Sequence, residues 1–457
     1  MNKHYHLIGI GGIGMSGIAK LLLRSGLRVS GSDIKESGIT EELAALGARV
    51  FIGHHPLNIE GADLIVYSSA VKEDNPEIRE AKNKGIPLIK RAQALAELMK
   101  DKTVITVTGS HGKTTTTSLA SCLLLEAGLS PSVAIGGILK NIDTNASLGN
   151  GNFFIAEADE SDGSFLYYRP RYSIITNIDR EHLDYYKDFA NELKAFGEFL
   201  NNTESGGCVF CSSDDNNLKE LLRGYKNRRV LFGLKEGADI IARNIQSKGL
   251  NSEFDCFFKG KFIERFNLAL GGEHNISNAL SVIALGLELG IDLAVTKKIL
   301  RDYQGARRRL EVKFENGEYQ LIDDYAHHPT EIKATLSAIG NLKFKRLIAV
   351  FQPHRYTRTK LLSDEFAKCF DAADYLVITD IYPAGEPAEE GVSAKLIYDK
   401  IRQNSPGKEA HYLAKEEITG HILGILKPGD LIITLGAGDI TKISDELAEE
   451  LKRQGQV

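Results

Sequence analysis

Two glycine-rich turns, each between a strand and a helix, constrain the fold of this chain more than any other feature. The first is Gly9-x-Gly11-x-x-Gly14 in "HLIGIGGIGMSGIA", and the second is "GSHGKT", residues 109–114, after the apolar run "VITVT". A turn of this kind places backbone N–H groups at a helix N-terminus, where a phosphate binds. The two turns therefore predict two phosphate-binding sites in separate α/β domains.

Short apolar strands alternate with helix-length segments along most of the chain, which is typical of parallel sheets. Helices are expected at 14–25, 40–47, near 76–84 and at 274–289. At 457 residues the chain is too long for a single core. We predict three α/β domains: a Rossmann-like domain at 1–100, a central P-loop ATPase-like domain at 101–308 and a Rossmann-like α/β domain at 309–457.

The net charge and the length of the apolar runs argue against nucleic acid and membranes as partners. The net charge is −5, whereas proteins that bind nucleic acid or membrane surfaces are usually basic. No apolar run approaches the roughly 20 residues of a membrane span, and the N-terminus enters a strand directly without a signal peptide. Five cysteines include one CxxC, at Cys208 and Cys211, but no second pair at zinc spacing. We expect reduced, structural cysteines in a cytoplasmic protein that binds neither nucleic acid nor membranes.

The first turn has the spacing of a dinucleotide-binding fingerprint. Asp33 ends the next strand 19 residues after Gly14, at the place where a carboxylate reaches a ribose hydroxyl. Close packing of a strand against a helix would also explain these glycines. The turn alone therefore leaves its ligand open.

The second turn resembles a P-loop but is two residues shorter than G-x-x-x-x-G-K-[ST]. Its context is that of a P-loop, because a strand precedes it and a helix follows it. Backbone amides and Lys113 would hold the β- and γ-phosphates of ATP, with the Thr114 hydroxyl on Mg²⁺.

Acidic residues and a histidine follow the next two strands. "IAEADESDGS" places Glu157, Asp159, Glu160 and Asp162 after one strand, and "ITNIDREHLDYY" places His182 after another. Carboxylates and an imidazole at strand ends are suited to hold Mg²⁺ over phosphates. For Asp159, Glu160 and Asp162 a solvated loop is the alternative interpretation.

Seven motifs in order resemble the Mur ligase family, which joins amino acids to peptidoglycan precursors with ATP. They span nearly the whole chain: "GSHGKTTT", "EADESD", "TNIDREHLDYY", "HNISNAL", "GARRRLE", "DDYAHHPTEI" and "FQPHRYTRT". The N-terminal turn with the last two motifs is most similar to the first-acting member. The resemblance implies that L-alanine is joined to the lactyl carboxylate of UDP-N-acetylmuramate through an acyl phosphate, giving ADP and phosphate. The first turn would then bind UDP and the second ATP.

The resemblance also implies roles for individual residues. Lys113, Glu157 and His182 would be catalytic, and Thr114, Glu157 and His182 would hold Mg²⁺. ATP would be bound by Gly109, Ser110, His111, Gly112, Lys113, Thr114, Thr115, His274, Asn275, Asn278, Arg309 and Asp324. The UDP-sugar would be bound by Gly11, Gly12, Ile13, Gly14, Asp33, Ser68, Ser69 and Ala70. The amino acid would be bound by His327, His328, Arg355 and Arg358 in the third domain.

Three other functions stay open at this point. The first turn and Asp33 fit a nicotinamide-dependent oxidoreductase, and the second turn fits a non-catalytic ATP-binding regulator. Within the family, a recycling ligase joins a whole tripeptide to the same UDP-sugar. Later-acting members carry a carbamylated lysine near the metals, and Lys194 is the nearest lysine but at an unconvincing spacing from His182. We expect a monomer or a weak homodimer.

Overall fold

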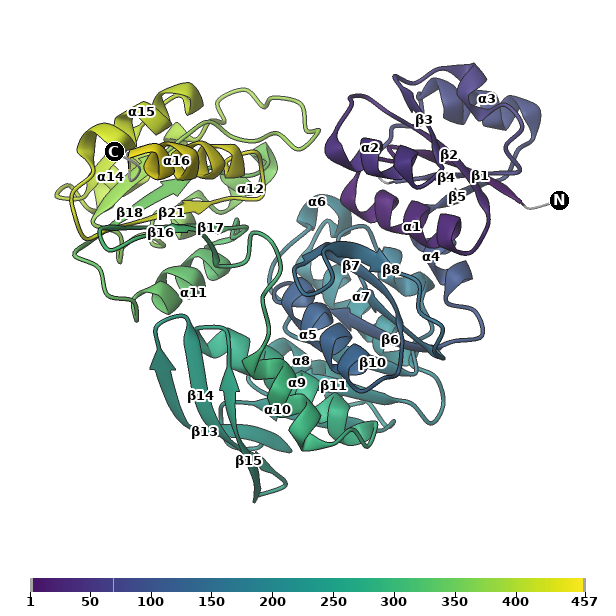
Figure 1. Ribbon diagram of the computed structural model, residues 1–457, viewed down its shortest axis with the longest axis horizontal. Coiled ribbons are helices and arrows are strands. Elements are labelled where there is room, and N and C mark those ends of the chain that lie inside the picture. The colour runs from purple at the N-terminus through teal and green to yellow at the C-terminus, as the bar shows by residue number, and fades with distance from the viewer. Residues whose placement is uncertain (1–2, 69, 455–457) are drawn as a thin grey trace. The chain divides into compact units, whose positions relative to one another are not determined.

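The computed structural model describes residues 3–68 and 70–454, which form three sheets with helices on their faces (Figure 1). The chain divides into two compact units. The first comprises the chain up to Asn244 together with Phe254–Asn267 and Ser277–Gln304, and the second comprises Ile245–Glu253, Leu268–Ile276 and the chain from Gly305 onward. The predicted three-part α/β architecture is confirmed, while the exact domain boundaries stay predictions.

The N-terminal sheet has five parallel strands in the order β3-β2-β1-β4-β5. Its strands are β1 (His4–Ile8), β2 (Arg28–Asp33), β3 (Arg49–Ile52), β4 (Leu64–Tyr67) and β5 (Leu88–Lys90). Its helices are α1 (Ile13–Arg24), α2 (Gly38–Ala45), α3 (Pro76–Lys84), α4 (Arg91–Leu98) and the 3-10 helix η1 (Pro56–Ile59). The strand order reverses at β1, which is where open α/β sheets bind ligands.

Alternation along β1 decides which helices cover each face of this sheet. Leu7 packs in one core with residues of α1, α2 and α4, whereas Ile8 packs in another with Ile59 of η1 and Ile78 of α3. Successive side chains of a strand point to opposite faces, so the sheet is covered on both sides. Helices on both faces require the right-handed crossovers of a doubly wound fold.

The central sheet has ten strands in the order β15-β14-β13-β12-β11-β10-β6-β9-β7-β8. Its strands are β6 (Thr103–Thr108), β7 (Ser132–Leu139), β8 (Thr144–Ser147), β9 (Phe153–Glu157), β10 (Tyr172–Ile175), β11 (Cys208–Ser212), β12 (Arg229–Gly233), β13 (Ile240–Lys248), β14 (Asn251–Phe258) and β15 (Lys261–Leu268). Its helices are α5 (Lys113–Glu126), η2 (Ser164–Tyr167), α6 (Leu183–Tyr186), α7 (Phe189–Asn201), α8 (Asn216–Leu222), α9 (Glu273–Glu288) and α10 (Leu293–Arg301).

Parallel pairing in the middle of this sheet brings three loops to one edge. β6 pairs with β9 on one side, with Val107 opposite Glu157, and with β10 on the other, with Thr108 opposite Ile175. The carboxyl ends of parallel strands meet at the same edge. The loops that follow β6, β9 and β10 therefore gather there.

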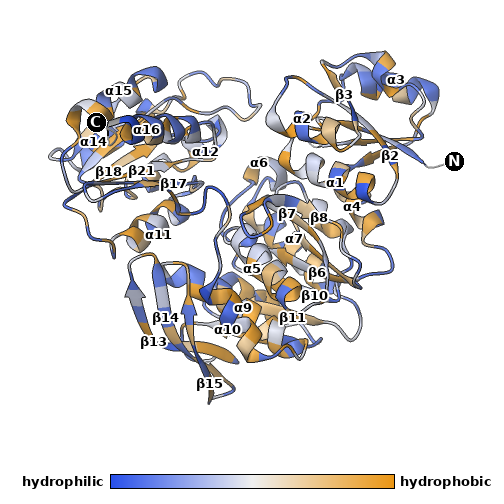
Figure 2. Cartoon of the chain, in the orientation of Figure 1, coloured by the Kyte–Doolittle hydropathy of each residue, from blue (hydrophilic) through white to orange (hydrophobic). Residues whose placement is uncertain are grey.

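The C-terminal sheet has six strands in the order β16-β17-β21-β18-β19-β20. Its strands are β16 (Glu311–Glu315), β17 (Tyr319–Asp324), β18 (Arg346–Phe351), β19 (Tyr375–Ile378), β20 (Glu409–Tyr412) and β21 (Asp430–Leu435). Its helices are α11 (Pro329–Ile339), α12 (Tyr356–Leu361), α13 (Ser363–Phe366), α14 (Lys395–Asn404), α15 (Lys415–Ile425) and α16 (Thr441–Gln454). α16 shows the helix periodicity well, because Ile443, Leu447 and Leu451 are buried while the face seen in Figure 2 is hydrophilic.

The sequence patterns located the N-terminal helices to within a few residues. Helix α1 starts one residue, and α2 two residues, before its predicted position. The patterns missed the strands β13, β14 and β15, which follow one another in sequence and in the sheet. They also missed two antiparallel pairs, β7 with β8 and β16 with β17. The strands β13, β14 and β15 carry polar residues at many positions, so their apolar signal is weak.

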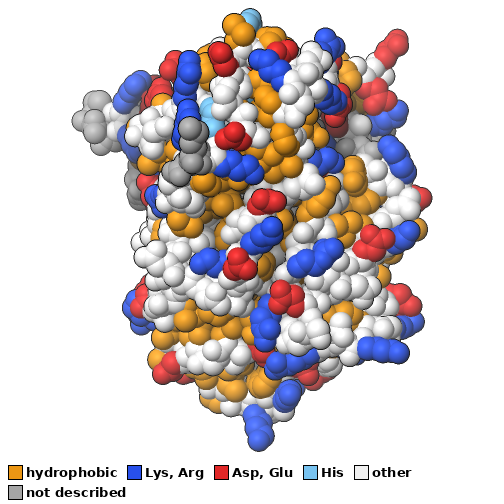
Figure 3. Space-filling model, turned by 90° about the vertical axis from the view of Figure 1, so that its right-hand side faces the viewer, with side chains coloured by type: hydrophobic (Ala, Val, Ile, Leu, Met, Phe, Trp, Pro, Cys, Tyr) orange, Lys and Arg blue, Asp and Glu red, His pale blue; other side chains and the backbone are white. Residues whose placement is uncertain are grey.

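Basic and acidic side chains are interspersed over the face shown in Figure 3, without a continuous patch of either sign. This distribution agrees with the small net charge. Among residues 3–68 and 70–454, no helix combines the length and the apolar character needed to cross a bilayer.

Candidate active site

The turn between β6 and α5 can be built only with glycine at two positions. Gly109 and Gly112 have φ values of 124° and 84°, in the region that favours glycine. A Cβ on Gly109 would lie 2.3 Å from Thr176 Oγ1, and one on Gly112 would lie 2.7 Å from Asn278 Oδ1. The turn is therefore packed against the loop after β10 and against α9, and its backbone is held in one conformation.

The Lys113 side chain folds back over this turn. Its Nζ donates to the carbonyl oxygens of Gly109 at 2.7 Å and Ser110 at 3.1 Å, and to Glu160 Oε1 at 2.8 Å. Burial alone would lower the pKa of Lys113, but the charges of Glu160 and Asp159 raise it overall. The ammonium group is therefore charged and fixed at the mouth of the glycine turn.

Two hard oxygen donors lie next to each other beside this lysine. Thr114 Oγ1 donates to Glu157 Oε1 at 3.2 Å, and Glu157 Oε2 accepts a hydrogen bond from the backbone N–H of Gly136 at 2.9 Å. Burial raises the pKa of Glu157, and the charge of Lys113 opposes that increase. A hydroxyl and a half-buried carboxylate are ligands that suit Mg²⁺.

A second group of possible metal ligands combines one residue of the loop after β9 with two residues of the loop after β10. Glu160, Glu181 and His182 each bring one ligand atom within 4.8 Å of the others. His182 Nε2 lies 3.4 Å from Glu160 Oε1 and 3.5 Å from Glu181 Oε2, and its backbone is left-handed, with φ 54°. Burial alone would lower the pKa of His182, but the Glu160 hydrogen bond and the charges of Glu181 and Glu160 raise it overall.

Glu160 links these two groups, because its Oε1 faces both Lys113 and His182. Its side chain is fully buried, and Oε2 has no hydrogen-bond partner among the described residues. The solvated-loop interpretation is therefore wrong for Glu160. Nothing in its sequence context distinguished it from Asp159, whose side chain is 39% exposed.

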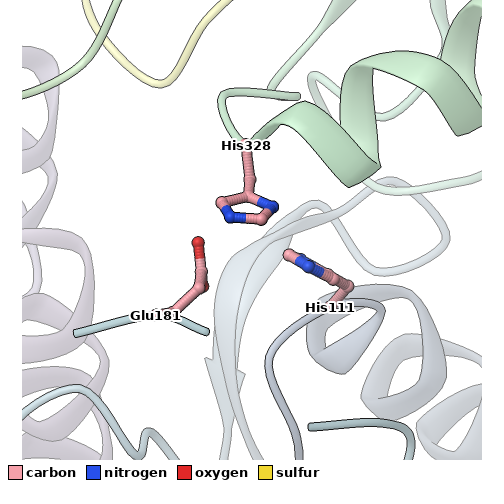
Figure 4. Close-up of side chains that lie close together, drawn as sticks. All are labelled: His111, Glu181 and His328. Atoms are coloured by element: carbon pink, nitrogen blue, oxygen red, sulfur yellow. The ribbon is translucent and has the colours of Figure 1, made fainter. Parts of the chain in front are cut away.

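The remaining residues of the turn hold the neighbouring loop. His111 donates its backbone N–H to Asn177 Oδ1 at 2.9 Å, and His111 Nε2 lies 3.1 Å from Asp179 Oδ2. Figure 4 shows that His111 belongs to the turn before α5, Glu181 to the segment before α6, and His328 to the start of α11. Thr115 is nearly buried in the first turn of α5.

The first glycine turn is closed by the carboxylate of Asp33. Asp33 Oδ2 accepts the backbone N–H of Gly11 at 2.8 Å, and a Cβ on Gly11 would lie 2.9 Å from the same oxygen. The N-cap of α1 is Gly12, which makes no side-chain hydrogen bond, so among the described residues the N–H groups of Ile13 and Gly14 are not capped by a side chain. Ser68 and Ala70 follow β4 beside this turn, while Ser69 lies outside the described residues.

The hairpin of β7 and β8 connects the first turn to the second. Asn145 on β8 donates from Nδ2 to the carbonyl oxygen of Ile13 at 2.5 Å and to Ser16 Oγ at 3.2 Å, and it accepts from Lys20 Nζ at 3.2 Å. Gly136 on β7 donates to Glu157. One hairpin therefore contacts both glycine-turn regions.

At the start of α9, the three predicted ATP-binding residues differ in their surroundings. Asn278 is buried and lies against Gly112, as described above. Asn275 is also buried, and its Nδ2 donates to the carbonyl oxygen of Gly271 at 2.8 Å. His274 is exposed.

In the C-terminal unit, Arg308 and Arg309 both lie over the Tyr325 ring, and Arg308 also makes side-chain hydrogen bonds. Arg308 Nε bonds Asp323 at 3.1 Å, and its other nitrogens donate to the carbonyl oxygens of Gly436 and Gly438. Arg309 lies over the Tyr325 ring at 5.0 Å. Asp324 accepts the backbone N–H groups of Leu310 and Ala326, so it fixes the segment after these arginines. The assignment of Arg309 and Asp324 to the ATP site stays a prediction.

The predicted amino-acid site gathers after β17 and β18. The His327 ring lies 5.4 Å from the His354 ring, and Arg358 Nη1 lies 3.2 Å from His354 Nδ1. Arg355 has a left-handed backbone, with φ 69°, at the start of α12. His328 caps α11, because its Nδ1 accepts the backbone N–H of Thr330 at 3.4 Å. His354 was missed, although it stands in the same "FQPHRYTRT" motif.

Two details concern residues outside the predicted sites. Lys194 is exposed on α7, whereas Glu192 on the same helix is fully buried. All five cysteines are buried, which agrees with a packing role.

Three family models match the chain in sequence. They are "Mur ligase family, catalytic domain" at residues 4–103, "Mur ligase middle domain" at residues 107–286, and "Mur ligase, glutamate ligase domain" at residues 308–438.

Curated relatives and solved structures extend over nearly the full chain. UDP-N-acetylmuramate--L-alanine ligases from Geotalea uraniireducens and Aquifex aeolicus are 45% and 46% identical, with 98% of each chain covered. The crystal structure of UDP-N-acetylmuramate-alanine ligase from Thermotoga maritima has a TM-score of 0.85 at 32% identity, covering 99% of both chains. A murein peptide ligase from Psychrobacter arcticus has a TM-score of 0.74 at 25% identity, covering 100% of this chain and 99% of that one. The chain belongs to the Mur ligase family.

Proposed function

We propose that this protein joins L-alanine to the lactyl carboxylate of UDP-N-acetylmuramate and converts ATP to ADP and phosphate. A carboxylate oxygen attacks the γ-phosphorus of ATP, and ADP leaves. The amine nitrogen of L-alanine then attacks the carbonyl carbon of the acyl phosphate, and phosphate leaves with that oxygen. The relatives at 45% and 46% identity carry the name of this activity.

The observation that carries the proposal is the arrangement at the second glycine turn. Lys113 is held by two carbonyl oxygens of the turn and by buried Glu160. Phosphate oxygens are acceptors of the same type, so the ammonium group can bind the β- and γ-phosphates without leaving the turn. A fixed charge next to the transferring group stabilises the transition state more than the ground state.

The residues present fit Mg²⁺. Thr114 and Glu157 would hold one ion with adjacent oxygen atoms, and His182 with Glu160 and Glu181 forms a second set of donors. Bound there, Mg²⁺ would neutralise phosphate charge. Gly136 and Lys113 orient the carboxylates of Glu157 and Glu160, respectively.

The predicted substrate sites are assigned to the other parts of the chain. The first turn, with Gly11, Gly14 and Asp33, would hold the UDP-sugar, and Arg355 and Arg358 would bind the carboxylate of L-alanine as planar cations. We further propose that the protein acts in the cytoplasm as a monomer or a weak homodimer. Light scattering coupled to size exclusion tests the oligomeric state.

Phosphate release tests the activity. ATP, Mg²⁺ and UDP-N-acetylmuramate should release phosphate only when L-alanine is added, and a tripeptide in its place should release far less. Equal or faster release with the tripeptide would instead establish the recycling activity. Oxidation of a reduced nicotinamide in this mixture, without phosphate release, would favour an oxidoreductase.

Heavy oxygen in the lactyl carboxylate tests the path. One labelled oxygen should appear in inorganic phosphate for each amide formed, because the attacking oxygen leaves with the phosphoryl group. Label in AMP, with pyrophosphate as the co-product, would contradict the acyl phosphate.

A further inference from the structure

We infer that Arg91 binds an anionic group of the UDP-sugar and positions it between the two glycine turns. This inference rests on the proposed function, and no motif of the sequence pointed to Arg91. The shared chemistry is an anion with several acceptor oxygens, which is either the diphosphate or the lactyl carboxylate.

Arg91 lies directly beside the first glycine turn. It begins α4, immediately after β5, and its guanidinium reaches α1: a Cβ on Gly14 would lie 2.8 Å from Arg91 Nη1 and 3.2 Å from its Cδ. Gly14 is the third glycine of the turn, and at this position any side chain would displace Arg91. The absence of a side chain at Gly14 therefore leaves room for the Arg91 guanidinium beside the turn.

On its other side, Arg91 faces the acidic loop after β9. Arg91 Nη2 lies 3.7 Å from Asp159 Oδ2. The next residue of this loop, Glu160, accepts a hydrogen bond from Lys113 Nζ at 2.8 Å. The acidic loop therefore contacts Arg91 through Asp159 and Lys113 through Glu160, which connects the proposed acceptor site to the proposed ATP site.

The described residues leave the hydrogen-bonding capacity of Arg91 unused. Its side chain is only 24% exposed, yet among the described residues its five N–H donors make no hydrogen bond, and the Asp159 pair at 3.7 Å is too long for one. Leaving a largely buried guanidinium without acceptors is unfavourable. An anion with several oxygens would satisfy these donors in the bidentate manner that arginine favours.

Calorimetry on the full chain tests the inference with two probes. UDP-N-acetylmuramate carries the diphosphate and the lactyl carboxylate, whereas UDP-N-acetylglucosamine carries only the diphosphate. Arg91→Gln should weaken binding of UDP-N-acetylmuramate by about tenfold or more, the value of one charge-assisted bidentate contact. Equal weakening for both probes assigns the diphosphate, and weakening only for UDP-N-acetylmuramate assigns the carboxylate. The affinity of Arg91→Lys for UDP-N-acetylmuramate should lie between those of the wild type and Arg91→Gln.

Three controls separate binding from a structural role. Arg79→Gln removes an exposed arginine of α3 in the same domain and should leave both affinities unchanged. A non-hydrolysable ATP analogue should bind Arg91→Gln as it binds the wild type, which shows that the variant is folded. Asp159→Asn should not weaken binding of the UDP-sugar, since it removes only the partner of Arg91.

Two results would overturn the inference: unchanged affinity of Arg91→Gln for both probes, or an equal loss in Asp159→Asn, which would mean that Arg91 only ties the loop. Failure of the wild type to bind UDP-N-acetylmuramate would instead contradict the proposed function.

Discussion

The buried carboxyl group of Glu192 should make the stability of the protein depend on pH. Glu192 lies in the first turn of α7 and is fully buried, and neither of its side-chain oxygens makes a hydrogen bond of normal geometry among the described residues. Burial raises its pKa from 4.5 to about 8, to which the charge of Glu160 adds, while the charge of His182 opposes it. The group is therefore largely protonated in the folded protein at neutral pH.

The direction of the effect follows from proton binding. Between about pH 4.5 and about pH 8 the unfolded chain has released this proton while the folded chain still binds it. The free energy of unfolding therefore falls as the pH rises through this interval, and the loss is complete above it. At about 1.4 kcal/mol per pH unit, the whole interval corresponds to on the order of 5 kcal/mol.

Glu192→Gln replaces the acid with a neutral group of the same shape, which removes this dependence. We expect the stability of the variant relative to wild type to increase by about 4 kcal/mol between about pH 5 and about pH 9. Urea unfolding followed by circular dichroism, without Mg²⁺ or nucleotide, measures the difference in free energy of unfolding between the variant and the wild type. Hydrogen exchange of the α7 amides identifies the unfolding transition in which α7 opens.

Glu198→Gln is the matched control, because Glu198 is exposed on the same helix. Its stability relative to wild type should not change with pH. A pH-independent difference for Glu192→Gln would refute the reasoning, since it would mean that Glu192 is ionised in the folded protein.

Three further predictions concern the glycine turns. Lys113→Ala should lower turnover by about a thousandfold or more. It should also lower the free energy of unfolding, because Glu160 is left buried without the Lys113 cation. Adding Glu160→Gln to this variant should restore stability in urea unfolding but should not restore turnover. Gly112→Ala should weaken ATP binding in calorimetry. The control Gly128→Ala, with a similar φ of 73° and nothing within 4 Å of its Cβ, should leave ATP binding unchanged. Equal weakening in both variants would mean that backbone strain, and not the position in the turn, causes the loss of ATP binding. Asn145→Ala should lower the free energy of unfolding by about 1–3 kcal/mol, because it leaves Lys20 without one of its partners, and an unchanged urea midpoint would contradict this role.

Local sequence determined both glycine turns and the elements around them. Gly109 and Gly112 can be recognised because a strand, a left-handed turn and a helix follow one another within a few residues, and each requirement is met by residues adjacent in the chain. For the same reason α1 and α3 were predicted closely, since apolar periodicity and caps are local signals.

Tertiary structure alone decided which polar side chains meet. Glu160 and Asp159 are neighbours in one acidic run, but only Glu160 is buried against Lys113, 47 residues away. Arg91 is close to both Gly14 and Asp159 only because β5 and β9 place their following segments there. The burial and partners of a charged residue depend on which strands pair, and strand pairing is fixed by contacts distant in sequence rather than by the residue's own neighbours.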